Sequence, residues 1–83
     1  MNKILVSIYV LAIDEWIDVF LPVSIYMYEA IELIQNVIKE NSSNNYVCNE
    51  EALLYSCENG KVINKNNIVK FSGLKNGSRV ILK

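Results

Sequence analysis

The sequence contains no histidine, two cysteines, three glycines and one proline among its 83 residues. Without histidine the chain cannot form a His-based catalytic triad, a histidine metal site or an imidazole pH switch. Two cysteines without histidine argue against a zinc site within one chain, and three glycines leave no phosphate-binding loop of the G-x-x-x-x-G-K-[ST] type. We therefore expect no cofactor, no metal and no enzymatic activity, which leaves a small binding or interaction module.

The hydrophobic content of the chain, 52%, is too high for a disordered segment and predicts a packed core. Ordinary domains run to about 100–150 residues, so residues 1–83 are expected to form a single domain. A domain of this size buries only about 60–65% of its unfolded surface, so we expect modest stability.

Charge is divided unevenly along the chain although the net charge is −1. Residues 1–58 hold two lysines and all nine acids, net −7, whereas residues 59–83 hold five lysines, one arginine and no acid, net +6. Two interpretations stay open: the two parts attract each other, or the basic part meets an anionic partner or membrane surface. Phe71 is the single aromatic residue of the basic part, so we expect no nucleic-acid partner.

The apolar run of residues 4–13 superficially resembles a signal peptide, since it follows Lys3 near the N-terminus. It is too short to span a bilayer, which takes about 20 apolar residues. It is also rich in β-branched residues, and Asp14-Glu15-Trp16 follows where a cleavage site needs small residues. We expect a cytoplasmic protein with Cys48 and Cys57 as thiols, and a small secreted protein is the alternative.

Two stretches, residues 4–11 and 16–21, alternate with the period of two that is typical of β-strands. The short Asp14-Glu15 turn between them predicts an antiparallel hairpin, and Pro22 ends the second strand. The side chains expected in the core are Ile4, Val6, Ile8 and Val10 in the first strand and Ile17, Val19 and Leu21 in the second.

The hydrophobic period changes to 3.6 between residues 27 and 40, which predicts an amphipathic helix. Ser24 is the nearest residue with a capping side chain, and the polar run Asn41–Asn45 is expected to stop the helix. The apolar stripe comprises Met27, Ala30, Ile31, Leu33, Ile34, Val37 and Ile38, and the solvent-facing side comprises Glu29, Glu32, Gln35, Asn36 and Lys39.

The remaining sequence predicts a third strand at residues 52–57, a brief strand at 62–63 after the Asn59-Gly60 turn, and a closing strand at 79–83. Ile68, Phe71 and Leu74 are expected to plug the bottom of the core. One helix must then cover one face of one mixed sheet whose central strands are the first and the last. The predicted fold class is α+β, a β-grasp.

At this point the chain resembles ubiquitin-like proteins over nearly its full length. More narrowly it resembles the YukD/EsaB-like ubiquitin-fold proteins of the bacterial type VII (WXG100) secretion system. The segments that carry the resemblance are Asp18-Val19-Phe20-Leu21-Pro22-Val23, Glu29-Ala30-Ile31-Glu32-Leu33-Ile34, and Asn76-Gly77 before the final strand. Conjugation by ubiquitin needs a Gly-Gly tail, whereas this sequence ends at Lys83 with no glycine after Gly77, so a modifier role is not expected.

Eight residues are candidates for partner binding. Leu5, Tyr9, Leu11, Trp16 and Phe20 fall on the hairpin face that points away from the predicted helix, and exposed apolar patches with Trp and Tyr mark interfaces. Tyr55, Arg79 and Ile81 lie, by the resemblance, where ubiquitin-fold domains commonly offer a recognition patch. For both groups partial burial or an ordinary solvated sheet face is the alternative.

The resemblance implies an accessory or regulatory role in type VII secretion, exercised by docking on another protein. We expect a secretion-system subunit as partner, with membrane contact only indirect, and a homodimer through the same face is also considered. The alternatives are a ubiquitin-fold adaptor with another partner and, as a further class, a protein modifier or sulfur carrier.

Overall fold

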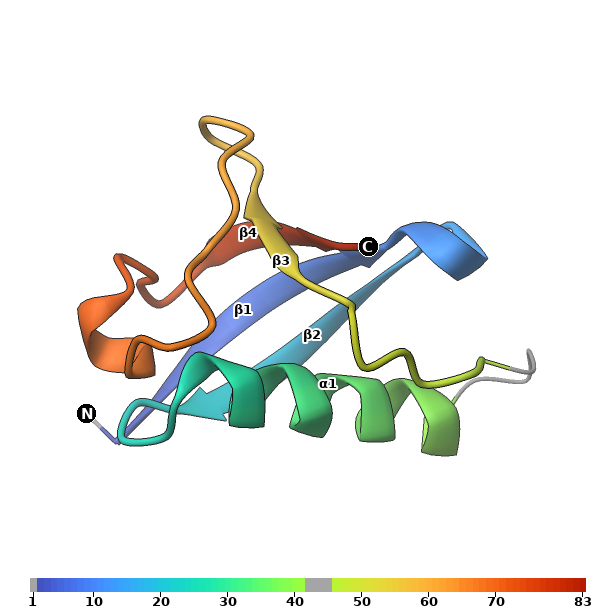
Figure 1. The fold of residues 1–83 in the computed structure, drawn as a ribbon, viewed down its shortest axis with the longest axis horizontal. Coiled ribbons are helices and arrows are strands. Elements are labelled where there is room, and N and C mark those ends of the chain that lie inside the picture. Colours follow the sequence, from blue (N-terminus) through green and yellow to red (C-terminus); the bar gives the residue numbers. More distant parts are fainter. Residues whose placement is uncertain (1, 42–45) are drawn as a thin grey trace.

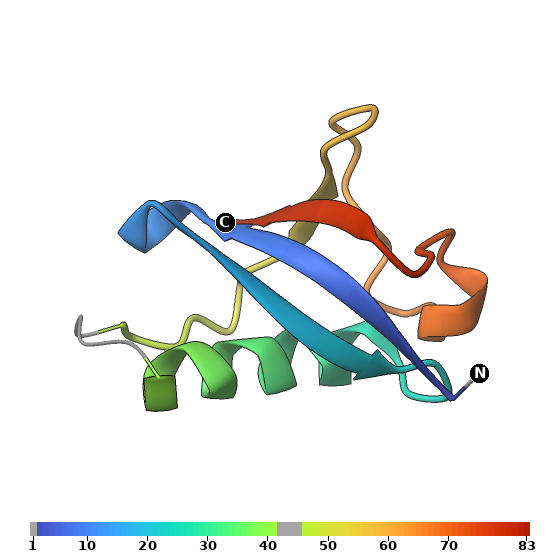
Figure 2. The same cartoon turned by 180° about the vertical axis from the view of Figure 1, so that it is seen from behind.

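The computed structural model describes residues 2–41 and 46–83. Its elements are β1 (Lys3–Val10), a 3₁₀ turn η1 (Leu11–Ile13), β2 (Glu15–Pro22), α1 (Met27–Asn41), β3 (Leu54–Ser56), a 3₁₀ turn η2 (Val69–Phe71) and β4 (Ser78–Leu82). The helix lies along one side of the sheet (Figures 1 and 2). The predicted breaker falls largely on residues 42–45, which lie outside the described residues.

The four strands form one mixed sheet in the order β2-β1-β4-β3. β1 pairs antiparallel with β2 from Lys3–Pro22 to Val10–Glu15, and parallel with β4 from Val6–Ser78 to Val10–Leu82. β3 joins the other side of β4 in antiparallel orientation. The first and last strands are therefore central, and the predicted β-grasp is confirmed.

The core lies between the sheet and α1. Every second residue of β1 is buried, because successive side chains of a strand point to opposite faces. The helix contributes an apolar stripe of Met27, Ala30, Ile31, Ile34 and Ile38, and β4 contributes Val80 and Leu82. The predicted inward set is confirmed, with Ile17 only partly buried.

The helix begins with hydrogen bonds that involve distant parts of the chain. The Tyr26 N–H donates to Glu29 Oε1 (3.1 Å), so that Glu29, not the expected Ser24, caps this end. The Met27 N–H donates to the Asn67 carbonyl (2.7 Å) and the Tyr28 N–H to the Lys65 carbonyl (3.0 Å). The first N–H groups of a helix have no acceptor within the helix. Here the connection of residues 57–77 supplies carbonyl acceptors for two of them.

Gln35 corrects the predicted solvent-facing side of the helix, because it is buried. Its Oε1 accepts from the Tyr46 hydroxyl (2.9 Å) and the Asn49 N–H (2.7 Å), and its Nε2 donates to the Asn49 carbonyl (3.0 Å). Both functional ends of the amide are therefore satisfied, and the side chain fixes the segment that leads to β3.

The connection between β3 and β4 also differs from the expectation. Phe71 is 70% exposed instead of plugging the core, and Val69 of η2 is fully buried in its place. Ile68 and Leu74 are partly buried, as expected of residues at the bottom of the core. Val62 forms only an isolated bridge with Tyr55, and the predicted strand at residues 62–63 is absent from the described residues.

We predict that Gln35→Ala lowers the free energy of unfolding by about 1–3 kcal/mol, because it leaves the Asn49 N–H without its acceptor in a part-buried site. Urea unfolding followed by circular dichroism measures the change. Asn36→Ala, at the exposed neighbouring position, is the matched control and should change stability by less than about 0.5 kcal/mol. Equal losses in the two variants would contradict a structural role for the Gln35 amide.

Candidate partner-binding face

The sheet face that points away from α1 carries seven of the eight candidate residues. We call it the open face and define it as Leu5, Ser7, Tyr9, Trp16, Asp18, Phe20, Tyr55, Arg79 and Ile81. The strand registers place all nine on the same side, since each pairs directly with another member. The α-helix of the described residues packs on the opposite side, so the helix leaves this face uncovered (Figure 2).

One row of the open face crosses all four strands. Trp16 on β2 pairs with Tyr9 on β1, Tyr9 pairs with Ile81 on β4, and Ile81 pairs with Tyr55 on β3. The sequence offers the hairpin residues and the residues of the later strands as two separate candidate groups. The pairing of Tyr9 with Ile81 joins them into one surface. Three of the four side chains are aromatic, which is the composition of an interface anchor.

A polar row and a second apolar pair lie beside it. Ser7 pairs with Asp18 on one side and with Arg79 on the other, and its hydroxyl donates to Asp18 Oδ1 at 2.7 Å. Leu5 pairs with Phe20 in the next apolar position. The face is therefore apolar at both ends with a carboxylate and a guanidinium between, an arrangement that adds orientation to apolar contact.

Exposure differs between the members of this face. Trp16 is 54% and Phe20 62% exposed, because β2 is an edge strand. Leu5, Tyr9, Tyr55 and Ile81 are partly buried by their neighbours. The β2 side therefore offers the largest apolar area that a partner could cover.

The positions of Tyr9 and Trp16 are set by the tight turn after β1. Asp14 adopts the left-handed conformation (φ 51°, ψ 49°), in which its N–H reaches the Leu11 carbonyl. Its carboxylate accepts a hydrogen bond from the Tyr9 hydroxyl. The rings of Tyr9 and Trp16 lie 5.4 Å apart at an interplanar angle of 54°, a favourable tilted geometry. The aromatic end of the row is thus preorganised.

Leu11 departs from the expectation. The sequence predicts it as the last outward residue of the first strand, but the chain leaves the sheet after Val10 and Leu11 lies in η1. Its side chain is 52% exposed and lines a shallow hollow with Tyr46, Val47 and Ala52. It therefore belongs to the rim beyond the strand rather than to the cross-strand row.

The β3 side of the open face carries positive charge. Lys83 Nζ lies 4.7 Å from the centroid of the Tyr55 ring, within cation–π range. Arg79, also exposed, stands in the polar row next to Ser7. Asp18 lies at the β2 side of the face, and Asp14 lies in the adjoining turn with its carboxylate on the Tyr9 hydroxyl, so the face is acidic at one edge and basic toward the other.

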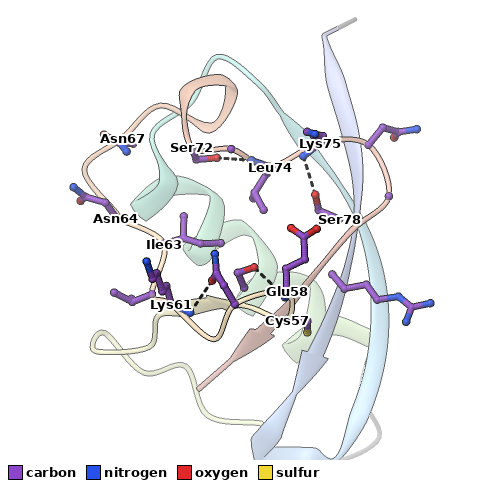
Figure 3. A pocket seen from close by; sticks show the side chains of 17 residues that line it. Cys57, Glu58, Lys61, Ile63, Asn64, Asn67, Ser72, Leu74, Lys75 and Ser78 are labelled. Atoms are coloured by element: carbon purple, nitrogen blue, oxygen red, sulfur yellow. Dashed lines mark hydrogen bonds between the residues drawn. The ribbon is translucent and has the colours of Figure 1, made fainter.

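Two further features escape sequence reasoning. Tyr26 and Tyr28 at the start of the helix are exposed and stack on each other (5.3 Å between centroids, 15° between planes). An open cavity of about 850 Å³ lies between the 56–64 turn and the 72–79 segment, with Lys61, Lys75 and Glu58 among its lining side chains (Figure 3). The tyrosine pair and the cavity both depend on the path of the connection between β3 and β4, whose sequence has no regular hydrophobic period.

Within residues 2–41 and 46–83, no three cysteine or carboxylate side chains gather where a metal ion could bind. Cys48 and Cys57 are free and exposed. In the same described part of the chain, no helix is long and apolar enough to cross a membrane.

Comparison with known proteins identifies the fold class. No protein family description and no curated protein matches the chain. A solved structure described as molecular mimicry of SUMO that promotes DNA repair superposes with a TM-score of 0.81 at 16% identity, covering 100% of this chain and 92% of the other. The ubiquitin-like domain of EccD5 from Mycobacterium xenopi superposes with a TM-score of 0.72 at 16% identity, covering 100% and 94%. The fold is thus ubiquitin-like.

The same fold occurs in chains of different context. A chain of the MycP5-free ESX-5 inner membrane complex matches all of this protein with 21% of its own length (TM-score 0.71, 10% identity). A chain of the toluene 4-monooxygenase HD complex matches over 96% of this protein and 95% of its own length (TM-score 0.74, 11% identity). At these identities the likeness establishes architecture, and function has to be argued from the surface.

The Tyr9–Asp14 contact yields a pH prediction. The hydrogen bond to Asp14, burial and the negative charge of Asp14 together raise the pKa of the Tyr9 phenol above its usual value. Asp14→Gly, which keeps the left-handed backbone without steric cost, should lower this pKa. NMR of the Tyr9 ring across the alkaline range measures it.

Because the pKa of Tyr9 is raised in the folded state, the contact between the neutral Tyr9 hydroxyl and Asp14 stabilises the fold. This stabilisation is fully present below the pKa of an unfolded tyrosine, about 10. It is lost as the pH rises through the folded pKa. Asp18→Asn, which removes a carboxylate bonded to Ser7, is the control and should leave the Tyr9 titration unchanged. An unaltered titration in Asp14→Gly would contradict the assignment.

Proposed function

We propose that this chain is a non-enzymatic, ubiquitin-fold accessory or regulatory component of a bacterial type VII secretion system, of the YukD/EsaB-like kind. It acts by docking on another protein through the open face. The observation that carries this proposal is the row Trp16–Tyr9–Ile81–Tyr55, which runs across all four strands on the side away from the helix.

The row has the features of a recognition surface. Trp and Tyr are enriched among residues that dominate binding energy, and such anchors sit at the centre of an interface surrounded by weaker contacts. Here Trp16 supplies the most exposed anchor, while Asp18 and Arg79 supply polar groups that a partner can pair. Docking through this face requires no catalytic group.

Two observations support a role in secretion. The sequence segments around residues 18–23 and 29–34 resemble YukD/EsaB-like proteins. Among the matching structures, one is a chain of the ESX-5 inner membrane complex and another is the ubiquitin-like domain of EccD5. We infer a subunit of such a complex as the partner, met by residues 1–83 acting as a single cytoplasmic domain. The partner's cytosolic part is the region that this face would reach.

A second candidate function is that of a ubiquitin-fold adaptor with another partner. The match to the structure described as a SUMO mimic favours it, since that match has a TM-score of 0.81. Such an adaptor would use the same open face, so the identity of the recovered protein separates the two candidates. A protein modifier is the third candidate, and activation of a carboxylate by an adenylating enzyme would establish it.

We predict that Trp16→Ala abolishes partner recovery in a pull-down from the native cell, or weakens binding by about 30-fold or more, as expected of a hot-spot residue. The fold should persist, because Trp16 is 54% exposed and its main internal contact is the Tyr9 ring. Circular dichroism of the variant tests that point.

The matched control is Tyr28→Ala, an aromatic of similar exposure at the helix start. Recovery of a secretion-system subunit by the wild type and by Tyr28→Ala, but not by Trp16→Ala, supports the proposal. Analytical ultracentrifugation tests the alternative occupant, a second copy of this chain: a dimer that Trp16→Ala dissociates would assign the face to self-association. Undiminished partner recovery by folded Trp16→Ala would falsify the proposed docking face.

A further inference from the structure

The basic part of the chain gathers at one end of the molecule. Lys65, Lys70 and Lys75 lie on the connection that contains η2, and all three are exposed. This segment, orange in the ribbon, lies at the end opposite η1 and the acidic Asp14-Glu15 turn in both views (Figures 1 and 2). We call residues 65–75 the basic tip. It contains no acid.

An apolar side chain projects from the basic tip. Phe71 is 70% exposed, the most exposed aromatic of the described residues, and Lys70 Nζ lies 5.1 Å from the centroid of its ring. A large apolar group that stays in water costs free energy, which contact with another apolar phase would recover. An exposed phenylalanine beside Lys70, in a segment that also carries Lys65 and Lys75, fits a surface that is negatively charged outside and apolar within.

The turn that carries Phe71 is held firmly. Val69 is fully buried, and its N–H donates to the Ile25 carbonyl at 2.8 Å. The Lys70 N–H donates to the Val23 carbonyl at 3.0 Å. The backbone therefore points Phe71 outward at no further conformational cost on docking, as a preorganised contact should.

Two tyrosines border the same turn. Tyr26 forms a β-bridge with Ile68, and its ring stacks on Tyr28. Both rings are exposed. Tyrosine is enriched at the membrane–water boundary, where its ring is apolar and its hydroxyl stays wet.

Acidic residues near the tip are few. Glu29 has its carboxylate engaged by the Tyr26 N–H, and Glu58 lines the open cavity beside Lys61 and Lys75. Asp14 and Glu15 lie at the far end of a molecule 32 Å long. Charges separated by more than a Debye length, about 8 Å at physiological salt, are largely screened. The net charge of −1 therefore does not oppose contact through the tip.

We propose that the basic tip docks on an anionic lipid surface, with Phe71 entering the headgroup region and Lys65, Lys70 and Lys75 facing the negative charge. This inference is independent of the proposed docking function and replaces a purely indirect membrane contact with a direct one. The sheet row Trp16–Tyr9–Ile81–Tyr55 lies on other elements and remains free for a protein partner.

The test is co-sedimentation of the full chain with vesicles of phosphatidylcholine alone and of phosphatidylcholine mixed with phosphatidylglycerol. Binding is expected only to the mixed vesicles and should decline with salt. The triple variant Lys65→Gln, Lys70→Gln, Lys75→Gln should bind about a hundredfold more weakly, since each basic residue near such a surface contributes about fivefold. Phe71→Ala should lose about tenfold.

The matched control is Val47→Ala, which removes an apolar side chain that is 79% exposed and lies beside Leu11 at the η1 end, away from the tip. It should bind the mixed vesicles as the wild type does. Equal losses in Val47→Ala and Phe71→Ala, or no binding to mixed vesicles by the wild type, overturn the proposal. Circular dichroism confirms that each variant is folded before it is scored.

Two further measurements distinguish a lipid surface from other ligands that carry phosphate. Inorganic phosphate at matched ionic strength should not displace the vesicles. If it does, the lysines form a discrete phosphate site, with the cavity lined by Lys61 and Lys75 as its place, and the lipid proposal is wrong. A single-stranded oligonucleotide that binds more tightly than the mixed vesicles would likewise overturn it.

Discussion

The parallel pairing of β1 with β4 is the constraint on which the rest of the structure depends. It joins the two ends of the chain at the centre of the sheet, from Val6–Ser78 to Val10–Leu82. The Asn76 side chain extends this contact by accepting from the Leu5 N–H at 2.8 Å, and the Gly77 N–H donates to the Leu5 carbonyl at 2.7 Å. Gly77 has a φ of 90°, a conformation that suits glycine. Without this pairing β4, and β3 with it, would have no place in the sheet beside the β1–β2 hairpin.

The same pairing builds the core and the open face together. Because strand side chains alternate with a period of two, a register that buries Val80 against Ile8 also places Ile81 beside Tyr9. A shift of one residue would expose the core set and bury the aromatic row. The open face is therefore maintained by the packing energy of the opposite face, and it needs little stabilisation of its own.

Sequence periodicity predicted the strands, the helix and the inward residues because each of these depends on local alternation. It also placed Leu5, Tyr9, Trp16 and Phe20 on the outward side of the hairpin, whereas Tyr55, Arg79 and Ile81 came from the resemblance to ubiquitin-fold domains. Only the register between distant strands joins the two groups. Phe71 and Val69 show the limit of such reasoning. In a connection without regular period, hydrophobicity alone does not decide which apolar side chain turns inward, and the bonds to Val23 and Ile25 decide it here. Helical periodicity predicts Gln35 in solvent, because its partner backbone at Asn49 lies in an irregular segment that the period does not reveal.

The arrangement of charge follows from the same topology. The acids precede Asn59 in sequence and the bases follow it, and the β-grasp carries the late connection to the end of the molecule away from the β1–β2 turn (Figure 1). A chain of near-zero net charge thereby becomes a dipolar body, with Lys65, Lys70 and Lys75 at one end and Asp14 and Glu15 at the other. The open face contains both signs, since the edge strand β2 carries Asp18 and the inner strand β4 carries Arg79. A partner or surface of fixed charge pattern would therefore meet this domain in one preferred orientation, because electrostatic complementarity acts on approach before apolar contact is made.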